Sequence, residues 1–133
     1  ASITGPGAPF GVPASEGAKA AVEAINEQGE VAIELVIADI RTDPNEAAAQ
    51  VNQLIHTEQV DVLVGPIIGS AVLAAAPIAA DAQIPMVTPT ATSAVFEEDT
   101  AFYDWVFGVS VSDDDSVPAI MMNTTTVSTE AEW

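Results

Sequence analysis

The sequence predicts an α/β fold in which a parallel β-sheet is covered by helices on both faces. Short apolar runs alternate with helix-like segments, in the order strand, helix, strand, helix, strand, helix, strand. This alternation is typical of parallel sheets, because a crossover between parallel strands needs a helix-sized connection. The length of 133 residues fits a single domain, and only 5% of the residues are aromatic. We therefore expect one core built from aliphatic and small side chains.

The elements of the first half are predicted from local patterns. They are a strand stub at residues 1–4, a Gly/Pro loop at 4–11, a helix at 13–29 and a β-branched strand at 31–39. Gly29 is a natural stop for the first helix, and the second begins at Pro44, because proline suits the first helical position. Asp43 suits the N-cap, and Glu46 stands where a capping box places its acidic residue.

The second half continues the same alternation. Its predicted elements are a strand at 60–65, a helix at 70–83, a strand at 84–89 and a last strand within 101–112. Pro77 is expected to bend or break the third helix. Ligands of such sheets lie beyond the carboxyl ends of the strands, so the loops at 4–11, 65–70 and 88–93 should meet at one edge.

Composition excludes several classes of function. The net charge of −18, from 20 acidic residues against two basic ones, argues against binding to nucleic acid or to an anionic membrane surface. The charge is consistent with a salt-adapted protein, since salt would screen it, and also with an ordinary acidic protein. Cysteine is absent, which excludes disulfides and thiolate metal sites. No apolar run reaches membrane-spanning length, so we expect no membrane insertion of this chain. No signal peptide precedes Ala1, which also fits a mature or trimmed chain whose leader has been removed.

Catalytic motifs are not found. There is no G-x-G-x-x-G after a strand, no G-K-[ST] and no G-x-S-x-G. His56 is the only histidine and lies near a helix end, where a favourable dipole contact accounts for it. The acidic runs at 97–99 and 113–115 lack calcium-loop spacing and are interpreted as solvated turns. We expect no enzyme activity, no cofactor and no metal.

Neutral hydrogen-bond donors at strand ends remain as candidates for binding. Amides at Gly69 and Ser70 would favour a carboxylate, although Ser70 also suits a plain N-cap. Hydroxyls of Thr90 and Thr92 would contact a ligand or satisfy their own loop. Phe10, in the first loop, would contact an apolar ligand or form a lid over the core.

Three stretches in order resemble one known family. They are GPGAPFG…EGAKAAVEAIN, D-x-x-x-DPNEAAAQVNQLI and VDVLVGPIIGSAVLAAAPIAADAQIPMVTPTAT. Together, over residues 2–109, they resemble the amino-terminal lobe of type I periplasmic binding proteins, in the group of branched-chain amino acid and amide transporter receptors. The DPxxA helix start, the GP…A…A unit and the IPMxxPxAT strand end are specific as a set.

The resemblance implies an extracytoplasmic solute receptor that works with an ABC permease. In this family two flavodoxin-like lobes close over a small ligand, and the amino-terminal lobe grips the amino and carboxyl groups of an amino acid. The positions that match the family's ligand-binding residues are Phe10, Gly69, Ser70, Thr90, Ala91 and Thr92. This chain departs from the family's pattern in the position of the serine hydroxyl. Many members have serine first in an SG or SS pair, where this chain has Gly69 and then Ser70.

The expected organisation is an incomplete amino-terminal lobe at 1–109, truncated at its first strand, followed by a hinge start and irregular tail at 110–133. We expect the second lobe to be absent and the affinity of this chain to be reduced. The expected function is extracytoplasmic solute binding for an ABC transporter, with a small amino acid of branched-chain type or an amide as ligand. The alternatives are a ligand-sensing receptor or regulator lobe, and a truncated or engineered fragment without a function of its own.

Overall fold

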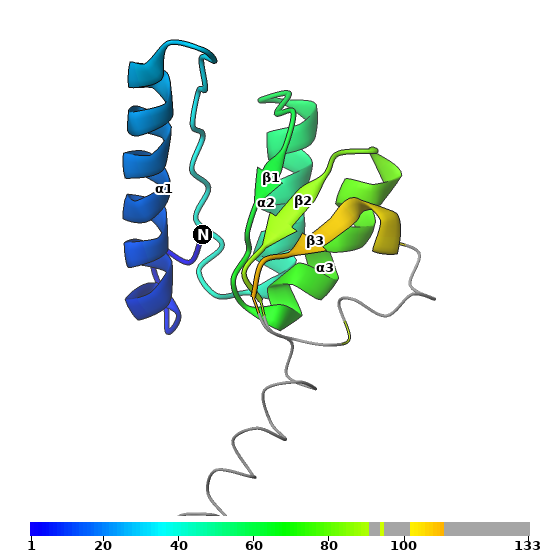
Figure 1. Cartoon of the computed structure of the whole chain (residues 1–133). Helices are drawn as coiled ribbons and strands as arrows, with labels where there is room; N and C mark the ends of the chain where they lie inside the picture. Colours follow the sequence, from blue (N-terminus) through cyan, green and yellow to red (C-terminus); the bar gives the residue numbers. More distant parts are fainter. Residues whose placement is uncertain (91–93, 95–101, 111–133) are drawn as a thin grey trace, which may run out of the picture.

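The computed structural model describes residues 1–90, 94 and 102–110, and it shows a parallel sheet with helices (Figure 1). Its elements are α1 (Ala8–Gln28), α2 (Pro44–His56), β1 (Leu63–Val64), α3 (Gly69–Asp81), β2 (Met86–Thr88), the 3₁₀ helix η2 (Tyr103–Trp105) and β3 (Val106–Gly108). The strands pair in the order β1-β2-β3, and both pairs are parallel. The predicted α/β class is therefore confirmed. The proposed tail lies outside the described residues from position 111 onward.

The core lies between the sheet and the pair of helices α2 and α3. Met86 in the central strand is fully buried and is in register with Leu63 on one side and Val106 on the other. The helices contribute mostly small side chains, as the scarcity of aromatic residues predicts. The buried residues of this cluster are Val51, Leu63, Val72, Ala75, Ala76, Ala79, Met86, Phe102 and Val106. Within the described ranges no helix is both long and apolar enough to cross a membrane.

Helix α2 begins where its sequence predicts. The Oδ1 atom of Asp43 accepts hydrogen bonds from the backbone N–H groups of Asn45 at 2.7 Å and Glu46 at 3.0 Å. The Glu46 carboxylate accepts from the side chain of Gln50 at 3.0 Å instead of reaching back to close a capping box. Asp43 therefore acts as a one-sided cap, which already satisfies two of the helix's first amides.

Helix α1 begins earlier than predicted, at Ala8, with Gly7 as its N-cap. Pro9 lies in the first turn, where the N–H that proline lacks has no partner within the helix, so this residue helps to start the helix. The prediction that Phe10 lies in a loop is wrong for this reason. The predicted stop at Gly29 is confirmed, because Gly29 has a left-handed φ of 73° and donates to the Asn26 carbonyl.

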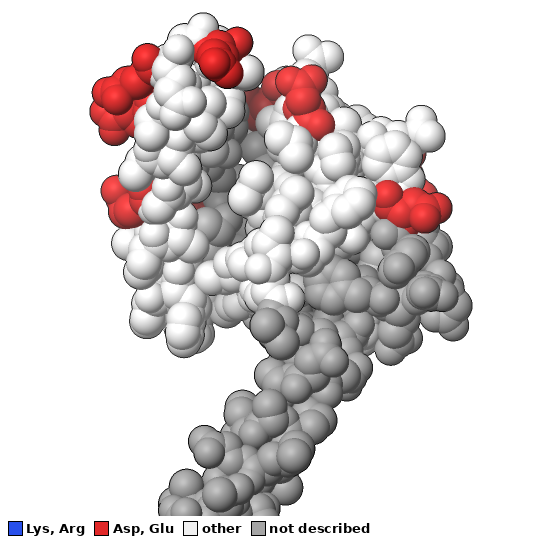
Figure 2. Space-filling model, viewed as in Figure 1, with Lys and Arg blue, Asp and Glu red and all other residues white. Residues whose placement is uncertain are grey.

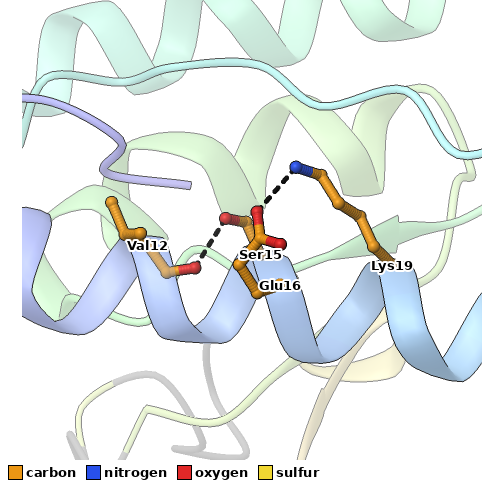
Figure 3. A network of polar contacts seen from close by, with 4 residues as sticks. All are labelled: Val12, Ser15, Glu16 and Lys19. Atoms are coloured by element: carbon orange, nitrogen blue, oxygen red, sulfur yellow. Dashed lines mark hydrogen bonds and ion pairs between the residues drawn. The ribbon is translucent and has the colours of Figure 1, made fainter.

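Ser15 is buried in α1 without needing a partner outside the helix. Its hydroxyl donates to the Val12 carbonyl at 2.8 Å, so the polar atom is satisfied one turn back (Figure 3). Lys19 forms an ion pair at 2.7 Å with Glu16 on the exposed side of the same helix. At this level of exposure the pair adds little stability.

The predicted strand at 31–39 forms no ladder in the structure, which corrects that prediction. The segment runs beside α1 (Figure 1). Among the described residues, the only backbone partner at the carboxyl-terminal end of the segment is Ala1. The Ala1 amino group donates to the Ala38 carbonyl at 2.7 Å, and the Ile40 N–H donates to the Ala1 carbonyl at 2.9 Å. A β-branched run can be extended by its own preference, but a ladder also needs a neighbouring strand. Residues 1–4 are too few to supply one, and they are not a strand in the structure either.

Helix α3 continues from Gly69 to Asp81 through Pro77. The predicted break at this proline is therefore wrong. Burial compensates for the backbone hydrogen bond that proline cannot make, because one face of the helix is almost completely enclosed. The buried residues of α3 are Ala71, Val72, Ala75, Ala76 and Ala79.

Candidate functional site

The candidate site lies at the carboxyl-terminal edge of the parallel strands, the lower edge in Figure 1. The loop before α1 reaches the loop before α3, since a Cβ added at Gly7 would come within 2.9 Å of the Ile68 side chain. The loop after β2 reaches the same place, because the Thr88 hydroxyl donates to the Pro66 carbonyl. The predicted convergence of the three loops is therefore confirmed for their described parts.

The N-terminus of α3 presents two backbone amides at this edge. Ile68 is the N-cap, with an extended backbone (φ −100°, ψ 123°) and no side-chain cap. Its carbonyl accepts from the N–H groups of Ala71 and Val72, both at 3.0 Å. Among the described residues, the N–H groups of Gly69 and Ser70 have no acceptor, and Ser70 is exposed. The alternative in which Ser70 is the N-cap is wrong, and the two amides with the helix dipole form an anion-binding arrangement.

Hydrogen bonds of Thr88 and Thr90 fix the segment that follows β2. Besides its bond to Pro66, the Thr88 hydroxyl accepts from the N–H of Thr90 at 3.3 Å. Thr90 is only 3% exposed, and its carbonyl accepts from the Ser110 hydroxyl at 3.0 Å. Thr88 thus satisfies the loop, a role that the prediction had considered for the later threonines. Ala91 and Thr92, also predicted as ligand-binding, lie outside the described residues.

Phe10 stands on the first turn of α1 with 69% of its surface exposed. The alternative in which it forms a lid over the core is therefore wrong. Nothing in the described part of the chain brings its ring against the α3 N-terminus, so a contact between Phe10 and a ligand stays a prediction.

Two residues that the sequence analysis did not single out hold the first loop in place. The Asp39 carboxylate accepts from the Thr4 hydroxyl at 2.6 Å and from the N–H groups of Ile3, Thr4 and Arg41 at 2.9, 3.2 and 3.0 Å. The Thr42 hydroxyl accepts from the Gly7 N–H at 2.8 Å. Positive φ at Arg41 and Thr42 turns the chain toward Gly7. The sequence contains a signal for Asp39, because this aspartate shortly precedes the Asp-Pro-Asn start of α2.

Hydrogen bonding makes Asp39 a source of pH-dependent stability. The Thr4 hydroxyl, and then the Arg41 N–H, hold the pKa of this carboxyl well below its usual range. Because the pKa is lower in the folded state, the stabilisation is present above the unfolded value of about 3.9 and is lost as the pH falls through and below it. We expect Asp39→Asn to lower the urea midpoint at pH 6, with the difference from wild type shrinking toward pH 3. A constant difference at both pH values would contradict this account.

Acidic side chains on the face in Figure 2 lie toward the upper part of the view, away from the edge where the strands end. Within the described ranges no cluster of three or more His, Asp or Glu side chains is placed to hold a metal ion. The groups described above at the N-terminus of α3 and at the end of β2 are backbone amides and hydroxyls. Such groups can bind and orient an anion.

A model of the periplasmic binding protein family matches residues 1–125, and the chain belongs to that family. The chain is 30% identical over 96 residues to the Leu/Ile/Val-binding protein BraC3 of Rhizobium johnstonii. That match covers 70% of this chain and 26% of BraC3.

Solved structures give the same result. The branched-chain amino acid transporter substrate-binding protein LivJ of Streptococcus pneumoniae, in complex with isoleucine, is 30% identical with a TM-score of 0.75. The match covers 84% of this chain and 32% of LivJ. An ABC transporter solute-binding protein of Rhodopseudomonas palustris, in complex with 3,4-dihydroxybenzoic acid, is 26% identical with a TM-score of 0.70, covering 83% of this chain and 30% of that protein. The chain thus spans about a quarter to a third of these proteins and corresponds to one lobe of their fold.

Proposed function

We propose that this chain is the ligand-gripping lobe of an extracytoplasmic solute receptor for an ABC permease, with a small branched-chain amino acid as the ligand. The observation that carries the proposal is the pair of amides at Gly69 and Ser70, which lie at the edge where three loops meet. Family membership supports the receptor role. The lobe carries out no chemical step.

The chemistry shared by the relatives' ligands favours a carboxylate as the ligand group that this lobe binds. Isoleucine, the ligand in LivJ, has an amine and no ring, whereas 3,4-dihydroxybenzoic acid, the ligand in the R. palustris protein, has an aromatic ring and no amine. In both ligands a hydrocarbon group carries a carboxylate. Two amides at a helix N-terminus suit this group, because charge-assisted hydrogen bonds are stronger than neutral ones. The amides of Gly69 and Ser70 would bind the two carboxylate oxygens in this proposal.

The amine and the side chain of the ligand would contact the remaining predicted residues. Thr90 follows β2 at the same edge, and hydroxyl and carbonyl oxygens can accept hydrogen bonds from an ammonium group. Ala91 and Thr92, which lie outside the described residues, belong to this proposal by their sequence positions alone. Phe10, exposed on α1, would border the apolar side of the ligand. A branched-chain amino acid is preferred over an aromatic acid, since BraC3 and LivJ are both 30% identical to the chain.

A titration with fragments of the ligand tests this proposal. The full chain would be titrated by calorimetry with isoleucine, with a matched carboxylate that lacks the amine (3-methylpentanoate), and with the matched amine that lacks the carboxylate (2-methylbutylamine). We expect isoleucine to bind best, the carboxylate more weakly and the amine not measurably. Binding of the amine with an affinity equal to that of the carboxylate would contradict a grip through Gly69 and Ser70. No binding of any of the three would favour a fragment without a function of its own.

A further inference from the structure

Gly7 lies where the loop before α1, the turn before α2 and the loop before α3 meet. It is the N-cap of α1, and its carbonyl accepts from the N–H groups of Phe10 and Gly11 at 3.0 and 2.9 Å. Its own N–H donates to the Thr42 hydroxyl at 2.8 Å. The beginnings of α1 and α3 both lie toward the lower edge of the view in Figure 1. The backbone of Gly7 is therefore fixed on two sides, at the edge that holds the candidate site.

Space, rather than backbone conformation, requires glycine at this position. The φ of −83° and ψ of −1° at Gly7 are values that residues with a side chain also adopt. A Cβ built on Gly7 would lie 2.8 Å from Oγ1 of Thr42, 2.9 Å from Cδ1 of Ile68 and 3.1 Å from Cβ of Ser2. Non-bonded carbon atoms prefer separations of about 3.5–4.0 Å, so an added methyl group has to displace a neighbour.

Ile68 is the neighbour that an added methyl group would displace. Rotation of the Thr42 hydroxyl would break its hydrogen bond with the Gly7 N–H, and Ser2 is fully buried. Cδ1 of Ile68, in contrast, is the free end of a flexible side chain. That side chain packs against a small buried cluster on its other side, so it has little room to turn away unless the backbone of Ile68 also moves. The cluster consists of Ile40, Ala47 and Ala71.

The backbone of Ile68 sets the direction of the first amides of α3. Ile68 is the N-cap of this helix, and its carbonyl accepts from the N–H groups of Ala71 and Val72. The amides of Gly69 and Ser70 follow it directly and make no hydrogen bond among the described residues. Hydrogen bonds weaken steeply as the donor angle departs from linearity, so a shift of Ile68 changes how these amides meet an anion.

We propose that Gly7 is a positioning residue for the ligand site: the space left by its missing side chain seats Ile68 and thereby sets the direction of the Gly69 and Ser70 amides. Thr42 shares this role, because its hydroxyl holds the N–H of Gly7. The inference rests on the proposed function, in which the two amides bind a carboxylate. It adds that their geometry depends on a residue of another helix, which does not touch the ligand in this proposal.

Alanine at position 7 tests the proposal. Gly7→Ala should shift the NMR signals of the Gly69 and Ser70 N–H groups in the ligand-free chain, and weaken isoleucine binding about tenfold. Gly17→Ala is the matched control, because it makes the same change in the same helix where a Cβ would meet no atom within 4 Å. The control should leave the signals and the affinity unchanged. Equal behaviour of the two variants would overturn the proposal.

A second substitution shows whether Gly7 acts through Ile68. Ile68→Val removes Cδ1, the carbon atom that a Cβ at position 7 would meet at 2.9 Å, and leaves the backbone as it is. In the Ile68→Val background, Gly7→Ala should change the Gly69 and Ser70 signals and the isoleucine affinity much less than it does in the wild-type background. An effect of the same size in both backgrounds would overturn the proposed route.

Variants of Thr42 test the same role without added volume, and they decide the question if Gly7→Ala does not fold. Thr42→Val removes the acceptor of the Gly7 N–H and keeps a branched side chain, whereas Thr42→Ser keeps the hydroxyl. The valine variant should shift the Gly69 and Ser70 signals in the ligand-free chain, and the serine variant should hardly do so. Unchanged signals in Thr42→Val would contradict the positioning role. Failure of the wild-type chain to bind isoleucine would instead contradict the proposed function, because these signals are read without ligand.

Discussion

Replacing Gly69 by proline should weaken binding of isoleucine by about 10- to 100-fold, as expected for loss of one hydrogen bond to a charged group worth about 1.5–3 kcal/mol. The Gly69 amide makes no hydrogen bond among the described residues, so its removal costs α3 nothing. Proline is preferred at a first helical position, and the extended backbone of Ile68 is the conformation that a residue before proline adopts. The effect is measured by titration of both proteins with isoleucine.

Two matched variants separate the amide from other properties of this position. Gly69→Ala adds a Cβ but keeps the N–H, so its affinity should stay within a few-fold of wild type. Ser70→Ala removes the hydroxyl and keeps the Ser70 amide, so it distinguishes a grip by amides from one by the shifted hydroxyl. If Gly69→Pro bound isoleucine like wild type while Ser70→Ala lost binding, the hydroxyl would be the gripping group and the amides would not.

Thr88→Val should lower the free energy of unfolding by about 1–3 kcal/mol, the cost of removing a buried hydrogen-bonding group. Valine keeps the shape of the side chain but loses the donor to the Pro66 carbonyl and the acceptor for the Thr90 N–H. The bond to Pro66 joins the end of β2 to the loop before α3, and the bond from the Thr90 N–H holds the loop after β2, so binding should weaken as well. The change is measured as a shift of the urea midpoint at constant m-value.

Thr88→Ser is the matched control, because serine keeps the hydroxyl and loses only a methyl group. It should retain more of the isoleucine affinity than Thr88→Val. If the valine variant were as stable as wild type, the buried hydroxyl would not hold the two loops together.

Local signals in the sequence predicted the helices better than the strands. Asp43 and Pro44 place the start of α2, and Gly29 the end of α1, through contacts within a few residues. The segment 31–39 has every local property of a strand, yet pairing depends on a distant neighbour that a local pattern does not contain. The predicted break at Pro77 was also wrong because of contacts that a local pattern does not contain: burial of one face of α3 outweighs the tendency of proline to break a helix.

The candidate site could be predicted in outline because parallel strands bring their following loops to one edge. The resemblance added the particular positions, and the amides of Gly69 and Ser70 make no hydrogen bond among the described residues, while the ligand-binding role of these positions stays a prediction. Thr42 was missed because its role depends on a turn with positive φ at two non-glycine residues, which the sequence does not signal. Asp39 was missed although the D-x-x-x-DPN spacing was available, because its hydrogen bonds to Ile3 and Thr4 join segments far apart in the sequence. The buried hydroxyl of Thr88 was assigned to the strand end, and only the fold shows it joining two loops.

Amide-resolved NMR of the isotopically labelled chain during addition of isoleucine tests the central claim most directly. If the N-terminus of α3 grips the ligand's carboxylate, the largest shift changes occur at the N–H groups of Gly69 and Ser70, and the same signals respond to 3-methylpentanoate. Thr90, on the neighbouring loop, should respond to isoleucine. Saturable binding that leaves the Gly69 and Ser70 signals unchanged would contradict the account.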